Sequence, residues 1–126
     1  MKKKELMSYV DDYITYGNLM GDSSSAPSKH NATYKKMEKI FGISINSDDK
    51  ELFYKTVLEK TNDVNTLTSC YVHMLKLGID VKQALKGLEK ISQDESLGIL
   101  RFNAEMCLHE WSNGNIKPVK TINELK

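Results

Sequence analysis

Several things that would define a function are scarce in this 126-residue sequence. It contains two prolines, two cysteines, one tryptophan and a single arginine, Arg101. No apolar run approaches the ~20 residues that cross a bilayer. The basic start at Met1–Glu5 leads into acids and tyrosines rather than into the apolar stretch of a secretory signal. We therefore expect a cytoplasmic protein with free thiols and no membrane partner.

The charge balance is equally unspecific. The sequence has 18 lysines and arginines against 17 aspartates and glutamates, for a net charge of +1. A near-neutral chain with one arginine lacks the field and the bidentate donors by which proteins hold nucleic acid. The main lysine cluster joins Lys2–Lys4 to Lys35, Lys36 and Lys39, and we interpret it as a solvated face. Nucleic-acid binding would require these lysines to line a groove.

Common catalytic motifs are missing as well. The sequence has no GxxxxGK[ST] phosphate loop, no GxGxxG, no GxSxG and no His-Glu-x-x-His. We accordingly expect no enzyme activity, cofactor, metal ion or small-molecule substrate. Two Cys–His pairs, Cys70 with His73 and Cys107 with His109, leave a thiol enzyme or a metal site open as an alternative. We favour core positions for both cysteines, where cysteine behaves as a small hydrophobe.

What the sequence does contain is a helical spacing of apolar residues. With so few prolines the chain has room for long helices joined by short connections, apart from a longer loop at Gly21–Ser28. The predicted helices are Lys3–Met20, Lys29–Phe41 ended by Gly42, one opening at Ser47–Asp49, Asp63–Leu77 ended by Gly78, one opening at Asp80, and Glu95–Ser112. They form one domain over 1–116, followed by a short tail over 117–126.

Two helix starts carry capping signals. Asp48 with Glu51, and Asp80 with Gln83, have the three-residue spacing of a capping box. The acids at these starts also favour the positive end of the helix dipole. We therefore interpret the acidic pairs along the chain as helix starts or solvated positions rather than as catalytic carboxylates.

Alternate predicted helices share a register. Equivalent positions 37 residues apart are Thr33, Cys70 and Cys107; Tyr34, Tyr71 and Leu108; Met37, Met74 and Trp111; and His30, Leu67 and Ala104. A fixed period of this length is typical of stacked helical hairpins. We therefore predict an all-α fold in which six helices form three αα-hairpins, stacked as a short HEAT-like α-solenoid.

Two groups of side chains stand apart from the predicted core. Tyr9 and Tyr16 flank the core residue Tyr13 at the edge of the apolar face of the first helix. Phe102 lies nearly opposite the apolar stripe Leu97–Trp111 of the last helix. Either that helix is buried on two sides, or Phe102 is exposed and serves as an anchor for a partner.

The last predicted helix also carries a family pattern: glycine, then Phe-x-Ala-Glu-x-x-Leu-x-x-Trp, then glycine. The matching positions are Gly98, Phe102, Ala104, Glu105, Leu108, Trp111 and Gly114. Here the chain resembles a small bacterial family of uncharacterised HEAT-like helical-repeat proteins, with looser similarity over most of 6–116. Family members tend to have an arginine and paired alanines where this chain has Asn65–Ser69. No role is therefore transferred through that arginine.

The family is often met beside polymorphic toxin genes, so the resemblance implies an immunity role. On that basis we expect a non-enzymatic protein that occludes the active site of a cognate, contact-dependent type toxin domain, in particular a nuclease. The candidate contacts are Tyr9, Asp12, Tyr16, Ser69, His73, Lys76, Phe102, Glu105 and His109. We place those on the later helices on outward faces. The alternative is a helical-repeat scaffold or regulatory protein-binding module with no toxin partner.

Overall fold

The computed structural model describes residues 6–20 and 27–116. Within these residues the chain is all-helical, as predicted, with six α-helices, one 3₁₀-helix and no strand. The elements are α2 (Val10–Met20), α3 (Pro27–Ile45), α4 (Lys50–Lys60), α5 (Val64–Leu77), α6 (Val81–Ser92), the 3₁₀-helix η1 (Glu95–Leu97) and α7 (Ile99–Ser112). The predicted continuous helix over Lys3–Met20 is wrong, because Ser8 and Tyr9 form a turn and α2 begins at Val10. Its start at Lys3, most of the loop after Met20 and the tail over 117–126 lie outside the described residues.

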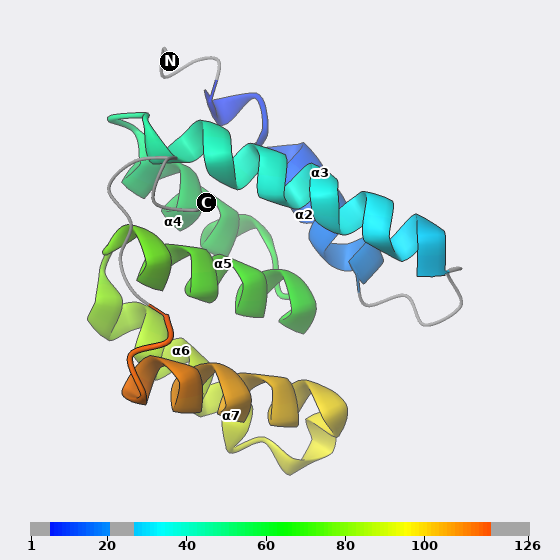
Figure 1. Cartoon of the computed structure of the whole chain (residues 1–126), viewed down its shortest axis with the longest axis vertical. Helices are drawn as coiled ribbons and strands as arrows, with labels where there is room; N and C mark the ends of the chain where they lie inside the picture. The colour runs from blue at the N-terminus through cyan, green and yellow to red at the C-terminus, as the bar shows by residue number, and fades with distance from the viewer. Residues whose placement is uncertain (1–5, 21–26, 117–126) are drawn as a thin grey trace.

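Consecutive helices pack in pairs, and the pairs follow one another down the long axis of the molecule (Figure 1). α2 packs on α3, α4 on α5, and α6 on α7. α5 is the central helix, because it also contacts α2, α6 and α7. One face of α5 consequently belongs to the N-terminal helices and the other to the C-terminal pair.

The predicted end of the second helix at Gly42 is wrong. α3 continues through Gly42 to Ile45. A glycine inside a helix costs only about 1 kcal/mol relative to alanine, and the extra turn buries Ser44 and Ile45. Burial of the Ile45 side chain is worth more than the glycine costs, so tertiary packing overrides the local signal.

The Asp48–Glu51 capping box is also wrong. α4 begins at Lys50 with Asp49 at its N-cap, and no side chain caps it. Instead the buried Ser47 hydroxyl accepts a hydrogen bond from the Asp49 N–H at 3.1 Å. The serine that precedes the two acids therefore stabilises this turn.

The helix signals around α5 and α6 are confirmed. Gly78 ends α5 in the left-handed region, with φ 71°. The Ile79 N–H then donates to the Met74 carbonyl at 2.9 Å, and the Ile79 side chain is buried. The Asp80 carboxylate caps α6 by accepting from the Gln83 N–H at 3.3 Å.

The last predicted helix is divided in two. Residues Glu95–Leu97 form η1, and Gly98 has a φ of +58°, a value that glycine adopts readily. α7 then starts at Ile99 rather than at Glu95. The Asp94 carboxylate stabilises the short helix by accepting from the Ser96 N–H at 3.1 Å.

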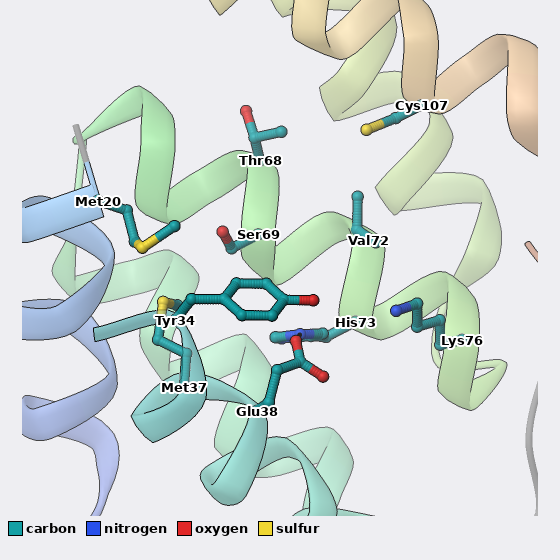
Figure 2. A pocket seen from close by; sticks show the side chains of 10 residues that line it. All are labelled: Met20, Tyr34, Met37, Glu38, Thr68, Ser69, Val72, His73, Lys76 and Cys107. Atoms are coloured by element: carbon teal, nitrogen blue, oxygen red, sulfur yellow. Dashed lines mark hydrogen bonds and ion pairs between the residues drawn. The ribbon is translucent and has the colours of Figure 1, made fainter. Parts of the chain in front are cut away.

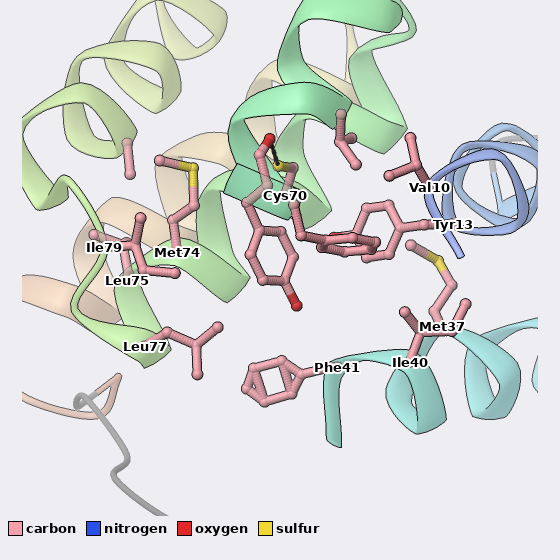
Figure 3. Packing of buried hydrophobic residues seen from close by; sticks show 14 of the residues in the cluster. Val10, Tyr13, Met37, Ile40, Phe41, Cys70, Met74, Leu75, Leu77 and Ile79 are labelled. Carbon is pink, nitrogen blue, oxygen red and sulfur yellow. Dashed lines mark hydrogen bonds between the residues drawn. The ribbon is translucent and has the colours of Figure 1, made fainter. Parts of the chain in front are cut away.

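The core is rich in aromatic rings where α2, α4 and α5 meet (Figure 3). The Tyr13 ring packs edge-on against Phe53 and Tyr54, with centroids 5.6 and 5.8 Å apart. Tyr54 is fully buried, and its hydroxyl lies 2.8 Å from the Ser44 hydroxyl. The sequence pattern did not identify Tyr54 as a core residue.

The 37-residue register agrees with burial on the core side only. Met37 and Met74 are both buried, whereas Tyr34 is 52% exposed although its equivalent Tyr71 is partly buried. The side chain of His30 lies outside the part of the chain that the structure describes. The equivalence therefore holds between α3 and α5 for side chains facing the centre of the molecule, whereas Trp111, at the same register position on α7, is only partly buried.

Candidate protein-binding surfaces

The nine predicted contact residues fall into three separate regions. Tyr9, Asp12 and Tyr16 line a groove between α2 and α3, which we call the α2–α3 groove. Ser69, His73 and Lys76 line a cleft beside α5, which we call the α5 cleft. Phe102, Glu105 and His109 are exposed on the outer side of α7, which we call the α7 outer face. The structure brings each set together but does not join the three.

The α2–α3 groove combines aromatic rings with lysines. It has a volume of about 260 Å³ and is completed by Lys36, Lys39, Ile40 and Ile43 of α3. The Lys36 Nζ lies over the Tyr16 ring, 5.4 Å from its centroid. Lys35, Lys36 and Lys39 are exposed, while Lys2–Lys4 of the predicted lysine cluster lie outside the described residues.

The α5 cleft holds about 230 Å³ and mixes apolar with polar side chains. Figure 2 shows its lining residues on the α2, α3, α5 and α7 ribbons around one space. The lining side chains are Met20, Tyr34, Met37, Glu38, Thr68, Ser69, Val72, His73, Lys76 and Cys107. Met20, Thr68 and Ser69 also line an adjacent pocket of about 260 Å³ that reaches Asn103 on α7. The cleft therefore follows α5 between the two outer helix pairs.

The prediction that His73 faces outward is wrong. Its side chain is buried, with only 4% of the residue exposed. The Tyr13 hydroxyl lies 2.6 Å from its Nδ1, and a Glu38 carboxylate oxygen lies 3.3 Å from its Nε2. The ring also stacks on Phe41 with centroids 4.5 Å apart. His73 thus connects α2, α3 and α5 from inside, because its position on α5 faces Tyr13 and not solvent.

The partners of His73 indicate its protonation state. Burial lowers the pKa of His73, although the hydrogen bond to Glu38 opposes that shift. A neutral ring donates from Nε2–H to the Glu38 carboxylate and accepts from the Tyr13 hydroxyl at Nδ1. The bond from His73 in turn lowers the pKa of Glu38. We therefore describe the His73–Glu38 contact as a hydrogen bond rather than an ion pair.

Neither cysteine has the environment of a reactive thiol. Cys70 is fully buried, burial raises its pKa, and its Sγ lies 3.5 Å from the Tyr54 carbonyl oxygen. Burial also raises the pKa of the partly buried Cys107. Both shifts oppose formation of the thiolate that a nucleophile or metal ligand requires. Among the described residues, no three His, Cys, Asp or Glu side chains gather as a candidate metal site.

The α7 outer face exposes three large apolar side chains. Ile99 is 68% exposed, Phe102 53% and Met106 42%. The structure thus decides between the two alternatives for Phe102 in favour of exposure. Ile99 and Met106 were missed as candidate contacts, although their spacing from Phe102, at i, i+3 and i+7, could have identified them.

The opposite side of α7 accounts for that exposure. On that side, Ala104 is the one fully buried residue of α7. The partly buried residues there are Leu100, Cys107, Leu108 and Trp111, which face the rest of the chain. A helix packed on one side only leaves the residues 180° away in solvent. Since those residues are apolar, the α7 outer face is the described surface most typical of a protein contact.

No family model, curated protein or solved structure matches this chain. None of the described helices is long and apolar enough to cross a membrane.

Proposed function

We propose that this chain is an immunity protein that binds a cognate toxin domain and neutralises it by covering its active site. The observation that carries the proposal is the exposed apolar row Ile99, Phe102 and Met106 on α7. The same helix carries the Phe-x-Ala-Glu pattern of the family that it resembles, beginning at Phe102. Large exposed apolar patches mark protein contacts more often than chance exposure does.

The frame of the proposal is a short HEAT-like stack of three helical hairpins. The pairwise packing of α2 with α3, α4 with α5 and α6 with α7 supports this arrangement. In such stacks each hairpin contacts only its neighbours, and the terminal hairpins keep a free side. The free side of the last hairpin is then the α7 outer face.

Inhibition in this proposal is steric and electrostatic, with no chemistry performed by the chain. A stable complex buries about 1,600 Å² in total, and a domain of this size can supply its half. Apolar anchors near the centre of such an interface contribute most of the affinity, and we assign that part to Phe102. The polar side chains Glu105 and His109, exposed beside it, supply the surrounding contacts.

Co-expression with the toxin domain encoded next to this chain tests the proposal. We expect rescue of growth and a complex that co-purifies with the chain. Phe102→Asp is expected to abolish rescue, whereas Leu52→Asp, at an exposed leucine of α4, is expected to preserve it. Absence of both complex and rescue for the unaltered chain would overturn the proposal in favour of a helical-repeat scaffold with an unrelated partner.

A further inference from the structure

The exposed residues of α7 follow the spacing of a helix-binding face. Ile99, Phe102, Met106 and His109 occur at i, i+3, i+7 and i+10, which is the alternation of core positions in paired helices. Ile99, Phe102 and Met106 are each at least 42% exposed, and His109 is exposed as well. A row of this width and spacing matches the apolar face of one amphipathic helix.

One acid lies on each edge of this row. Glu105 follows one edge and Glu110 the other, at the positions that flank the core of a paired helix. Segment 91–116 contains no lysine, and its four acids against the one arginine give a net charge of −3 in a chain whose total is +1. The segment that carries the α7 outer face is therefore acidic, unlike the chain as a whole.

Arg101 does little to change the sign of these edges. It lies toward the packed side of α7, where its Nε donates to the Ser92 carbonyl at 2.8 Å. Its other contact is an ion pair with Glu105, at 3.4 Å and with both side chains more than 40% exposed. Such an exposed pair is weak. Glu110 accepts from the Asn115 side chain at 2.6 Å, a neutral donor that leaves its charge uncompensated.

A second copy of this chain fits the face poorly. In a parallel helix pair, Glu105 of one copy would lie beside Glu110 of the other, because these positions face each other across the core. In an antiparallel pair about a twofold axis, the Glu105 side chains of the two copies would meet. Like charges oppose pairing in both orientations. The face therefore suits a partner of opposite sign.

We propose that the α7 outer face docks an amphipathic helix of a partner protein that has apolar residues at i, i+3 and i+7 and lysine or arginine along its edges. This inference deepens the proposed function by naming the chemistry of the toxin surface that is bound. A nuclease carries cationic surface because it must hold a polyanion. An acidic row with apolar anchors complements such a surface.

Two model peptides test the charge preference directly. Each has the 14-residue length of α7, with leucine at the core positions, and carries either lysine or glutamate at all other positions. Titration calorimetry with the intact chain is expected to show binding of the lysine peptide, at least about tenfold tighter than the glutamate peptide and weakened by salt. Equal affinities for the two peptides would overturn the inference.

Matched variants locate the site. Phe102→Asp is expected to reduce the affinity for the lysine peptide at least about tenfold, since a central anchor is lost. Leu52→Asp is expected to change that affinity less than about twofold. The double variant Glu105→Lys and Glu110→Lys is expected to reverse the preference toward the glutamate peptide. Because Glu105 is exposed and Glu110 is only partly buried, this variant serves even if Phe102→Asp alters folding. Unchanged peptide binding by Phe102→Asp and by the double charge variant would overturn the inference. A dimer of the unaltered chain in light scattering that becomes monomeric in Phe102→Asp would also overturn it.

The peptide assay and the growth assay test the docking face and the immunity function separately. Peptide binding without toxin rescue would remove the immunity function and leave the docking face standing. Rescue that survives in the double charge variant would place the toxin elsewhere on the chain and overturn the assignment of this face, while the immunity function would stand.

Discussion

The two ends of the molecule are built differently. The helices α2–α5 enclose a core with four fully buried aromatic rings, those of Tyr13, Phe41, Phe53 and Tyr54. The α6–α7 pair contributes only small and aliphatic buried residues, Ala84, Leu88, Ile91 and Ala104. Of the six exposed large hydrophobic residues in the described part of the chain, three lie on α7. Stability is therefore concentrated in the first region, and the apolar surface available to a partner in the second.

Truncation of a core ring should show this difference most strongly. Phe53→Ala in α4 is expected to reduce the free energy of unfolding by about 3–5 kcal/mol, because it leaves a cavity beside Tyr13 and Tyr54. Leu108→Ala on α7, where the side chain is partly buried, is expected to cost about 1–2 kcal/mol. Urea unfolding of both variants measures this contrast. Equal losses would mean that the two regions share one uniformly packed core.

Close helix contacts provide the next largest expected effect. A Cβ at Gly17 would lie 2.4 Å from the Thr66 hydroxyl, where α2 crosses α5. Gly17→Ala is expected to destabilise the fold by about 2–3 kcal/mol, since the buried, β-branched Thr66 cannot move aside. Gly87→Ala should cost less, because the atoms it meets are the far end of the partly exposed Tyr71 ring. Thermal melts of both variants measure the two losses of stability. A larger loss for Gly87→Ala than for Gly17→Ala would contradict this prediction.

Removal of the Tyr13 hydroxyl tests whether its hydrogen bond to the buried His73 stabilises the fold. Tyr13→Phe leaves His73 Nδ1 buried without its 2.6 Å partner. The expected loss is about 1–2 kcal/mol in urea unfolding, the usual cost of an unsatisfied buried polar group. Tyr16→Phe, at a partly exposed tyrosine one turn further along α2, is the matched control and should be neutral. A silent Tyr13→Phe would remove the structural role of this bond.

The same histidine makes stability depend on pH. Because the pKa of His73 in the folded chain is lowered from 6.5, the unfolded chain binds a proton that the folded chain does not. The contribution of His73 to the free energy of unfolding is therefore fully present above pH 6.5. It falls as the pH drops below that value, with a slope of at most about 1.4 kcal/mol per pH unit. The pKa of Glu38 is lowered from 4.5, so its contribution is lost in the same direction at still lower pH.

A substitution separates His73 from other titrating groups. Urea unfolding between pH 7 and 5 is expected to show a smaller slope for His73→Gln than for the unaltered chain. A slope that persists in His73→Gln would assign the pH dependence to other groups.

The smallest expected effect on stability lies where the largest effect on binding is expected. Phe102→Ser should change the free energy of unfolding by less than about 0.5 kcal/mol, because the ring makes few contacts in the isolated chain. The same substitution should weaken binding to the lysine peptide described above. A stability loss near that of Phe53→Ala would show instead that α7 contributes to the core through this side.

The sequence predicted the end of α5 and the start of α6 correctly. Gly78 followed by Ile79, and Asp80 followed by Gln83, mark helix ends whose hydrogen bonds are local, so no distant residue is needed to predict them. Gly42 gave the opposite result, since whether a glycine ends a helix depends on what the next turn buries. Sequence alone could not supply that information.

The sequence by itself determined that this protein is helical, where α5 begins and ends, where α6 begins, and which side of α7 packs toward the centre of the molecule. Only the tertiary structure decided that His73 is enclosed between Tyr13 and Glu38 and that Phe102 is in solvent. An amphipathic pattern states which side of a helix prefers burial, because that preference is a property of neighbouring residues. How many sides are covered depends on the helices that arrive from elsewhere in the chain, and α5 is covered on two sides while α7 is covered on one.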